Sequence, residues 1–205
     1  WPEILAEDGY MPRQFSFRGD RLAYSWGIVL LAGIAFALLV LFNGDTHLSM
    51  SSFGSRGHLP GQFVQPRGLA LDGSSPQRLY VMDSYNERVE VFDKAGRYLS
   101  SFGSKGTLPG QFRGNNTRGL AIDRVHGWVF VVDITANAVD KFGLAGNFLQ
   151  TIGQGSLASV PSPPGTFVQG GREDAIDGVG HLWVGDMPNF RVQVFDGSTG
   201  GSLFV

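Results

Sequence analysis

Residues 51–63 read SSFGSRGHLPGQF, and the segment returns at residues 100–112 as SSFGSKGTLPGQF. From Phe53 to Phe102 is 49 residues, and the third counterpart, Ile152, follows 50 residues later. Further matches recur at the same spacing: GLALD at 68–72 with GLAID at 119–123, and YVMD at 80–83 with FVVD at 130–133. Self-similarity at this period, with strand-like content, predicts a propeller-like array of repeats.

Each repeat is expected to form a four-stranded antiparallel blade. Residues 89–92 (VEVF) alternate as a half-buried strand does, and the turns between strands end in glycine, where a positive φ is expected. The predicted strands are 68–71, 79–83, 88–92 and 97–102 in the first repeat, 119–122, 128–133, 138–142 and 147–152 in the second, and 174–176, 181–185, 191–195 and 201–205 in the third.

The motifs of these repeats resemble those of NHL-repeat β-propellers. The first repeat carries PGQF at 60–63, PRGLALD at 66–72, NERV at 86–89 and VFD at 91–93. The third repeat keeps Asp186, Asn189, Arg191, Val192 and VFD at 194–196. The second departs from the pattern, because Ala136 and Ala138 stand where Asn86 and Arg88 predict Asn and Arg.

The resemblance implies an all-β fold with about three blades, at residues 49–102, 103–152 and 153–205, of a probable six. Half a ring leaves blade faces and sheet edges open. We therefore expect that further blades, or a second copy of the chain, are needed to close the ring, and that the chain is a fragment of something longer.

The composition excludes several classes of site. Sixteen basic residues against 18 acidic ones give a net charge of −2, so no field favours a nucleic-acid partner. The absence of cysteine excludes disulfides and thiolate metal sites.

Residues 24–42 form an uncharged apolar run of 19 residues, which at ~1.5 Å per residue matches the ~30 Å hydrocarbon core of a membrane. Arg13, Arg18 and Arg21 precede the run, and no Lys or Arg follows it between 43 and 52. The positive-inside rule then predicts a cytoplasmic N-terminus and an extracytoplasmic propeller. A buried core helix or a signal peptide are the alternatives.

Residues 2–47 resemble a segment of amino acid/polyamine/organocation superfamily permeases. The residues that carry this are ILAEDGYMP at 4–12, a basic stretch and then the apolar run. One span cannot form a transporter's substrate site, so transport is not implied. Residues 1–48 are expected to be either a single-span anchor or a segment joined to an unrelated coding sequence near Leu48, and the join is preferred.

Three arginines share one position before the predicted inner strands: Arg67, Arg118 and Arg172. They are candidates for a ring of guanidinium groups that binds a carboxylate or phosphate. The alternative is that they bond loop carbonyls of the next blade. Tyr85 and Phe190, between second and third strands, are the other candidates, as partner-binding aromatics or as loop packing.

Two sets of aspartates also recur: Asp72, Asp123 and Asp177, and Asp83, Asp133 and Asp186. They could hold a divalent cation such as Ca²⁺, although closing turns through backbone N–H groups is the more usual role. The four histidines, His47, His58, His126 and His181, share no repeat position. No catalytic residue, metal ligand or cofactor is therefore predicted.

The leading hypothesis is a non-enzymatic recognition scaffold, possibly tethered to a membrane, whose loops 54–65, 103–117 and 153–171 meet a protein, peptide or glycan. The alternative is a lyase- or hydrolase-type propeller enzyme with a metal or acid/base group at the axis. Fold alone does not decide between them.

Overall fold

The computed structural model describes residues 52–153, 163–167, 171 and 173–203. The chain divides into two units, residues 1–51 and 52–205, and the described residues all belong to the second. The predicted span at 24–42, the permease-like segment and Arg172 lie outside the described residues. Among the described residues there is no helix with the length and apolarity that a membrane crossing requires.

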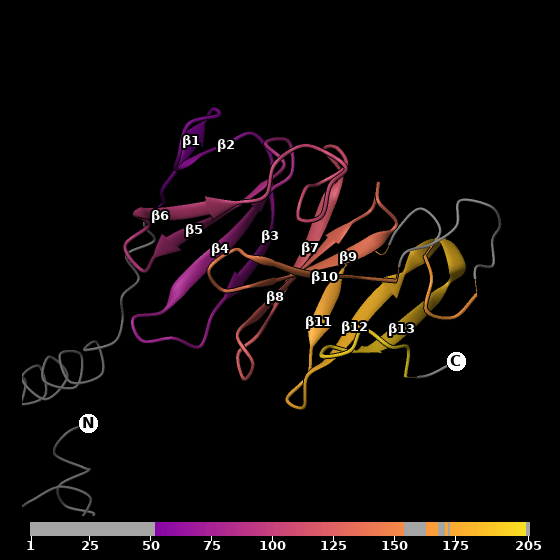
Figure 1. Cartoon of the computed structure of the whole chain (residues 1–205). Helices are drawn as coiled ribbons and strands as arrows, with labels where there is room; N and C mark the ends of the chain where they lie inside the picture. Colours follow the sequence, from indigo (N-terminus) through magenta and orange to yellow (C-terminus); the bar gives the residue numbers. More distant parts are fainter. Residues whose placement is uncertain (1–51, 154–162, 168–170, 172, 204–205) are drawn as a thin grey trace, which may run out of the picture. The chain divides into compact units, whose positions relative to one another are not determined.

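Three antiparallel sheets form the described unit (Figure 1), each with its strands in sequence order. The first sheet contains β3 (Pro66–Leu71), β4 (Arg78–Asp83), β5 (Arg88–Asp93) and β6 (Tyr98–Phe102). The second contains β7 (Thr117–Asp123), β8 (Trp128–Asp133), β9 (Ala138–Gly143) and β10 (Phe148–Ile152). The four-stranded antiparallel blades predicted for these two repeats are confirmed.

The third sheet has three strands, β11 (Asp174–Ile176), β12 (His181–Asp186) and β13 (Arg191–Asp196). A short 3-10 helix, Met187–Asn189, joins β12 to β13. The strand predicted at 201–205 is reduced, within the described residues, to one bridge between Phe195 and Ser202. Beside β13, backbone bonds also run from Leu203 N to Val194 O (2.8 Å) and from Asp196 N to Gly201 O (2.8 Å), and residues 204–205 of the predicted strand lie outside the described residues.

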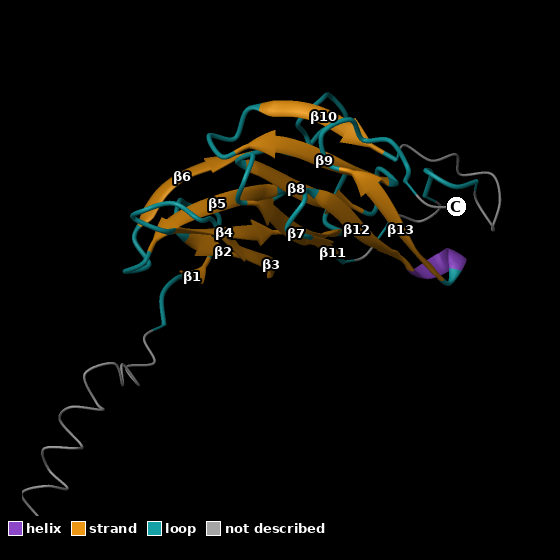
Figure 2. Cartoon of the chain, turned by 90° about the horizontal axis from the view of Figure 1, so that it is seen from below, coloured by secondary structure: helices purple, strands orange, loops and turns teal. Residues whose placement is uncertain are grey.

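The blades pack face to face, and the alternation of side chains along β8 shows how. Val129 and Val131 point into a cluster with Tyr80 and Met82 of the first sheet. Phe130 and Val132 point the other way, into a cluster with Leu182, Val184 and Phe195 of the third sheet. A central strand covered on both faces reads as an unbroken apolar run. Figure 2 shows β3, β7 and β11 along one side of this unit and β6 and β10 along the other.

A glycine and a phenylalanine brace each long loop that leads into a blade. The first loop also contains a short parallel pair, β1 (Ser55–Arg56) and β2 (Gln62–Phe63). A Cβ on Gly103 would lie 2.4 Å from the ring of Phe112, and one on Gly153 would lie 2.3 Å from the ring of Phe167. Both glycines have positive φ and both rings are fully buried. The repeated Phe-Gly and Gln-Phe pairs of the sequence thus recur together because the glycine of the first pair packs against the phenylalanine ring of the second.

One residue of the packed inner strands does not suit its position. Asp174 pairs with Val184 in β11 as Leu69 pairs with Val81 and Leu120 with Val131. Both of its carboxyl oxygens are buried, and neither accepts a hydrogen bond of ordinary geometry, although the backbone N–H groups of Ala121 and of Asp174 itself lie near them. Burial, helped by the negative charge of Glu173, raises the pKa of Asp174 well above its usual value.

We predict that Asp174→Leu stabilises the protein by about 1–3 kcal/mol at pH 7, because it removes an unsatisfied buried polar group. Since the folded-state pKa is raised, the penalty from Asp174 grows as pH rises above about 4, the pKa of an exposed aspartate. Thermal unfolding of both proteins between pH 4 and 7 measures this, and the advantage of the variant must widen with pH. An advantage that does not change with pH would contradict the assignment.

Candidate functional site

An aspartate ends the second strand of each blade and holds the loop that precedes the blade. Asp83 accepts hydrogen bonds from the backbone N of Val64 (3.1 Å) and Gln65 (2.9 Å), and Asp133 accepts one from the N of Arg113 (2.6 Å). Asp186 accepts from the side chains of Asn189, Arg191 and Gln193. All three aspartates are fully buried, so their recurrence has a structural explanation.

The second set of aspartates closes turns at the opposite end of the strands. Asp72 accepts from the backbone N of Arg78 (2.8 Å) and Asp123 from that of Val125 (2.8 Å). Asp177 accepts from the backbone N of His181 (2.9 Å). Within the described part of the chain, no three His, Asp or Glu side chains come together as metal ligands would.

Two of the three blades carry an arginine between the sheet and its long loop. In the first blade, the guanidinium of Arg88 donates to the carbonyls of His58 (2.9 Å), Leu59 (2.9 Å) and Gln62 (3.0 Å). It also forms an ion pair with Glu90 (2.7 Å), whose side chain is fully buried.

In the third blade, Arg191 pairs with Asp186 (2.8 Å) and donates to the carbonyls of Pro163 (3.1 Å) and Thr166 (3.2 Å). Each arginine therefore fastens its loop to its own blade.

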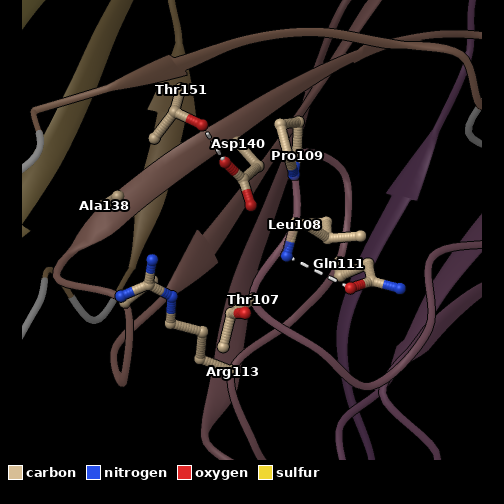
Figure 3. A pocket seen from close by; sticks show the side chains of 9 residues that line it. Thr107, Leu108, Pro109, Gln111, Arg113, Ala138, Asp140 and Thr151 are labelled. Carbon is tan, nitrogen blue, oxygen red and sulfur yellow. Dashed lines mark hydrogen bonds between the residues drawn. The ribbon is translucent and has the colours of Figure 1, made fainter.

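The middle blade has a cavity at this position. Ala138 faces Asp133 across the ladder as Arg88 faces Asp83 and Arg191 faces Asp186, so the alanine occupies the arginine position. The space left beside it has a volume of about 250 Å³ (Figure 3). The loop contributes Thr107, Leu108, Pro109, Gln111 and Arg113 to its wall, the sheet contributes Ala138, Asp140 and Thr151, and the turn between β8 and β9 contributes Ala136.

Asp140 is the acidic group of this cavity. It is 5% exposed, and its Oδ1 accepts a hydrogen bond from the hydroxyl of Thr151 (2.7 Å). Burial raises the pKa of Asp140 to about 6, with a further rise from the negative charge of Asp133 and an opposing effect of Arg113. Its position matches that of Glu90, because the two pair with Val131 and Val81 in their ladders.

The predicted arginine site lies at the start of the inner strands. Arg67 and Arg118 line one cavity of about 330 Å³ together with Glu173. Asn116 joins them, since its Oδ1 lies 3.3 Å from Arg67 Nη1 and 3.3 Å from Arg118 Nε. This bond from Arg67 to the loop of the next blade is the kind of contact that the structural alternative expected. Binding of an anion there stays a prediction.

The two aromatic candidates lie in turns between second and third strands. Tyr85 is 46% exposed and Phe190 is 93% exposed. Phe190 has φ 54°, and similar values occur at Glu87 (47°) and Asn137 (56°), which hold the same turn position in the other blades. Tyr85 therefore lies two residues before the repeat position that Phe190 occupies, so the two aromatics are not equivalent.

The sequence contains the signal for the cavity, although residue types alone do not mark it as a site. Ala136 and Ala138 distinguish the middle repeat as a departure from the pattern. That departure becomes a cavity only because the loop keeps its conformation without the arginine. The acidic residue at position 140 also varies between the blades, since the third blade has the neutral Gln193 at this position.

Comparison with known proteins agrees with this architecture. A family model described as a 6-bladed beta-propeller matches residues 73–160, which is under half of the chain. The solved structure of U3-55K has a TM-score of 0.51 at 14% identity, covering 73% of this chain and 40% of that one. The fold is a β-propeller. Hydrazine synthase of Kuenenia stuttgartiensis is similar to the same degree, with a TM-score of 0.51 at 9% identity over 72% of this chain and 37% of that one.

Two further proteins match the chain over short segments. The potassium transporter KimA of Bacillus subtilis (strain 168) is 52% identical over 42 residues, and the B-box type zinc finger protein ncl-1 of Caenorhabditis elegans is 44% identical over 46 residues. These segments are 20% and 22% of this chain but only 7% and 5% of those proteins.

We predict that Arg88→Ala destabilises the protein by about 2–4 kcal/mol, because it leaves the buried Glu90 without a counter-ion. Arg97→Ala is the matched control: it breaks an ion pair of similar length with Asp93 (2.6 Å), but Arg97 is 81% exposed and the cost should stay within about 1 kcal/mol. Denaturant unfolding of both variants tests this, and equal losses would refute the role given to Arg88.

Proposed function

We propose that this propeller is a non-enzymatic recognition module of NHL type, which binds a protein or peptide through the face that carries the long loops. The observation that carries the proposal is Phe190, a large apolar side chain almost wholly in solvent on a backbone in the left-handed region. A non-glycine residue there is unfavourable, and its exposed ring gains no packing in return. The left-handed turn recurs at Glu87 and Asn137, so it belongs to the repeat. What distinguishes Phe190 is its exposed ring, and aromatic side chains dominate binding energies at interfaces.

Other features of the same face support the proposal. In the first blade the turn after β4 bonds the long loop directly, from Asn86 Nδ2 to the carbonyl of Gly57 (3.0 Å). The turn with Tyr85 is therefore a neighbour of the first long loop, and Arg191, next to Phe190, donates to the carbonyls of Pro163 and Thr166 in the third. The cavity of the middle blade opens beside its own long loop. A buried carboxyl group in that cavity favours a peptide or protein, which can offer a cation, over a neutral glycan.

The enzyme alternative has less support. His126 and His181 bond Asp123 and Asp177 in their own turns (2.7 and 3.0 Å), and His58 bonds Asn86 (2.5 Å). These three described histidines thus lie on separate turns, each engaged locally. An acid/base mechanism requires unlike titratable groups around one reacting atom.

We predict that Phe190→Asn raises the melting temperature and abolishes partner binding. Asparagine tolerates the left-handed region, as Asn137 does at this position of the middle blade. Peptides selected from a random display library against the wild-type protein serve as the probe. Binding is then compared for the wild type, Phe190→Asn and Val179→Asn, whose side chain is 72% exposed in the turn between β11 and β12.

The control variant is expected to bind as the wild type does, because Val179 lies at the other end of β12 from Phe190. Peptides that bind all three proteins equally would refute the proposed face. A more stable Phe190→Asn variant that has lost binding distinguishes recognition from folding, since damage to the fold would lower the melting temperature.

We also propose that residues 24–42 tether the propeller to a membrane, with the blades on the extracytoplasmic side. The support is the uncharged apolar run and the arginines before it. The full chain is expected in the membrane pellet after an alkaline carbonate wash, and the double variant Leu31→Arg, Ala35→Arg in the supernatant. Wild-type chain in the supernatant would refute the tether, and sequencing the source DNA through codon 48 tests the predicted join.

A further inference from the structure

The loop of the middle blade has the same turn as the loop of the first blade. The backbone N of Gln111 donates to the carbonyl of Leu108 (3.0 Å), as Gln62 donates to Leu59 (3.0 Å). The side-chain oxygen of Gln111 accepts from the N of Leu108 (3.1 Å), an interaction that Figure 3 shows and that the first blade repeats at 3.2 Å. Loss of the arginine has therefore not altered the turn.

The carbonyls that surround Arg88 have counterparts in the middle blade. Arg88 donates to the carbonyls of residues 58, 59 and 62, and the same turn positions are held by Thr107, Leu108 and Gln111. All three line the cavity. Ala138 ends at its Cβ, so no side chain of the arginine position reaches these carbonyls.

The acid of the first blade's ion pair is also retained. Asp140 holds the position of Glu90 and lines the cavity, 5% exposed. Thr151 bonds one of its oxygens, but no cationic group stands within 4.0 Å of it among the described residues, whereas Glu90 has Arg88 at 2.7 Å. A buried carboxylate without a counter-ion is unfavourable. The middle blade has kept the acceptors of a guanidinium site and lost the donor.

We infer that the cavity beside Ala138 binds the guanidinium group of an arginine side chain presented by the partner, in the place that Arg88 fills in the first blade. This inference rests on the proposed function, because it names the chemical group of the partner that the loop face recognises. A guanidinium suits the site better than an ammonium, since its planar fork donates in several fixed directions at once and carries its charge at every relevant pH.

Arg113 stands at the rim of the cavity and is, among the described residues, the one cation that lines it. Figure 3 shows its guanidinium on the Ala138 side of the cavity and apart from the carboxylate of Asp140. It is exposed and follows the loop, whereas Arg88 projects from its strand. Arg113 could therefore compete with an incoming guanidinium group for the cavity, and a variant that lacks Arg113 is part of the test.

The test uses the full chain in detergent and N-acetyl-arginine amide as the probe, followed by NMR of backbone amides. The expected result is saturable shifts at Ala138, Asp140 and Thr107. The citrulline analogue, which has the same shape without the charge, is expected to bind at least about tenfold more weakly. The lysine analogue should also bind more weakly. Free arginine is tested as well, to distinguish a site for the free amino acid from a site for an arginine side chain of a protein. The charged amino and carboxylate groups of free arginine have no counterpart in the arrangement around Arg88.

Three variants assign the binding to this cavity. Ala138→Arg restores the first-blade arrangement within the chain, so it should abolish probe binding and raise the melting temperature. Asp140→Asn keeps an acceptor for Thr151 and should weaken binding at least about tenfold. Arg113→Ala should leave binding intact or strengthen it.

Binding should strengthen as pH rises from 5 to 7, because Asp140 must be ionised and its pKa is about 6. The charged groups that set this dependence are Asp133 and Arg113, and Asp140→Asn should remove it. Equal binding of the arginine and citrulline probes, or unchanged binding by Ala138→Arg, would overturn the inference. Loss of selected peptides in Phe190→Asn is independent of these outcomes, so the proposed face can hold while the guanidinium site fails.

Discussion

The bond between a buried carboxylate and the backbone of an incoming loop is the constraint on which the architecture depends. Asp83 and Asp133 sit at the same strand end and accept N–H groups from the loops before their blades. In the third blade, Asp186 accepts from the side chains of Arg191 and Gln193, which in turn donate to the loop carbonyl of Thr166. A buried carboxylate without such donors is unfavourable, as the raised pKa of Asp174 shows, so the loop N–H groups and the carboxylate of the sheet stabilise each other. This explains how long loops rich in glycine hold fixed positions on a frame of short strands.

Within that constraint, neighbouring positions can change without loss of the fold. The arginine that fastens the loop in two blades is absent from the middle one, yet the turn from Leu108 to Gln111 persists. The bond to Asp133, the contact between Gly103 and Phe112 and the backbone bonds of the loop itself remain to hold it. The side chains that hold the loop are thus different from the side chain whose place is empty in the middle blade. The carboxylate and the ring hold the loop, and the arginine position is available for another purpose.

Much of the fold could be predicted from the sequence, because the same pattern of strands and turns occurs in each repeat. The strands of the first two repeats agree with the structure to within two residues, since valine and phenylalanine runs and the glycine turns mark both ends. The strand predicted at 201–205 is seen only in part, because Ser202 bridges Phe195 and residues 204–205 lie outside the described residues. The candidate site was harder to predict from the sequence, because it is a cavity left where a large side chain is absent. Its identification required knowing that the loop around Ala138 does not collapse, which depends on contacts between residues far apart in the chain.

The acid position of the three blades also determines where a cationic ligand of the proposed kind would be attracted. In the first blade Arg88 neutralises Glu90, and in the third the position holds the neutral Gln193. Above about pH 6 the middle blade carries the charge of Asp140 with only the rim arginine nearby. Asp140 acts at short range, within about the Debye length of 8 Å at physiological salt, because the blade as a whole (residues 103–152) carries five basic side chains against three acidic ones. For the proposed guanidinium ligand, affinity should then depend on the contacts made after arrival, and association should show little long-range steering by this blade.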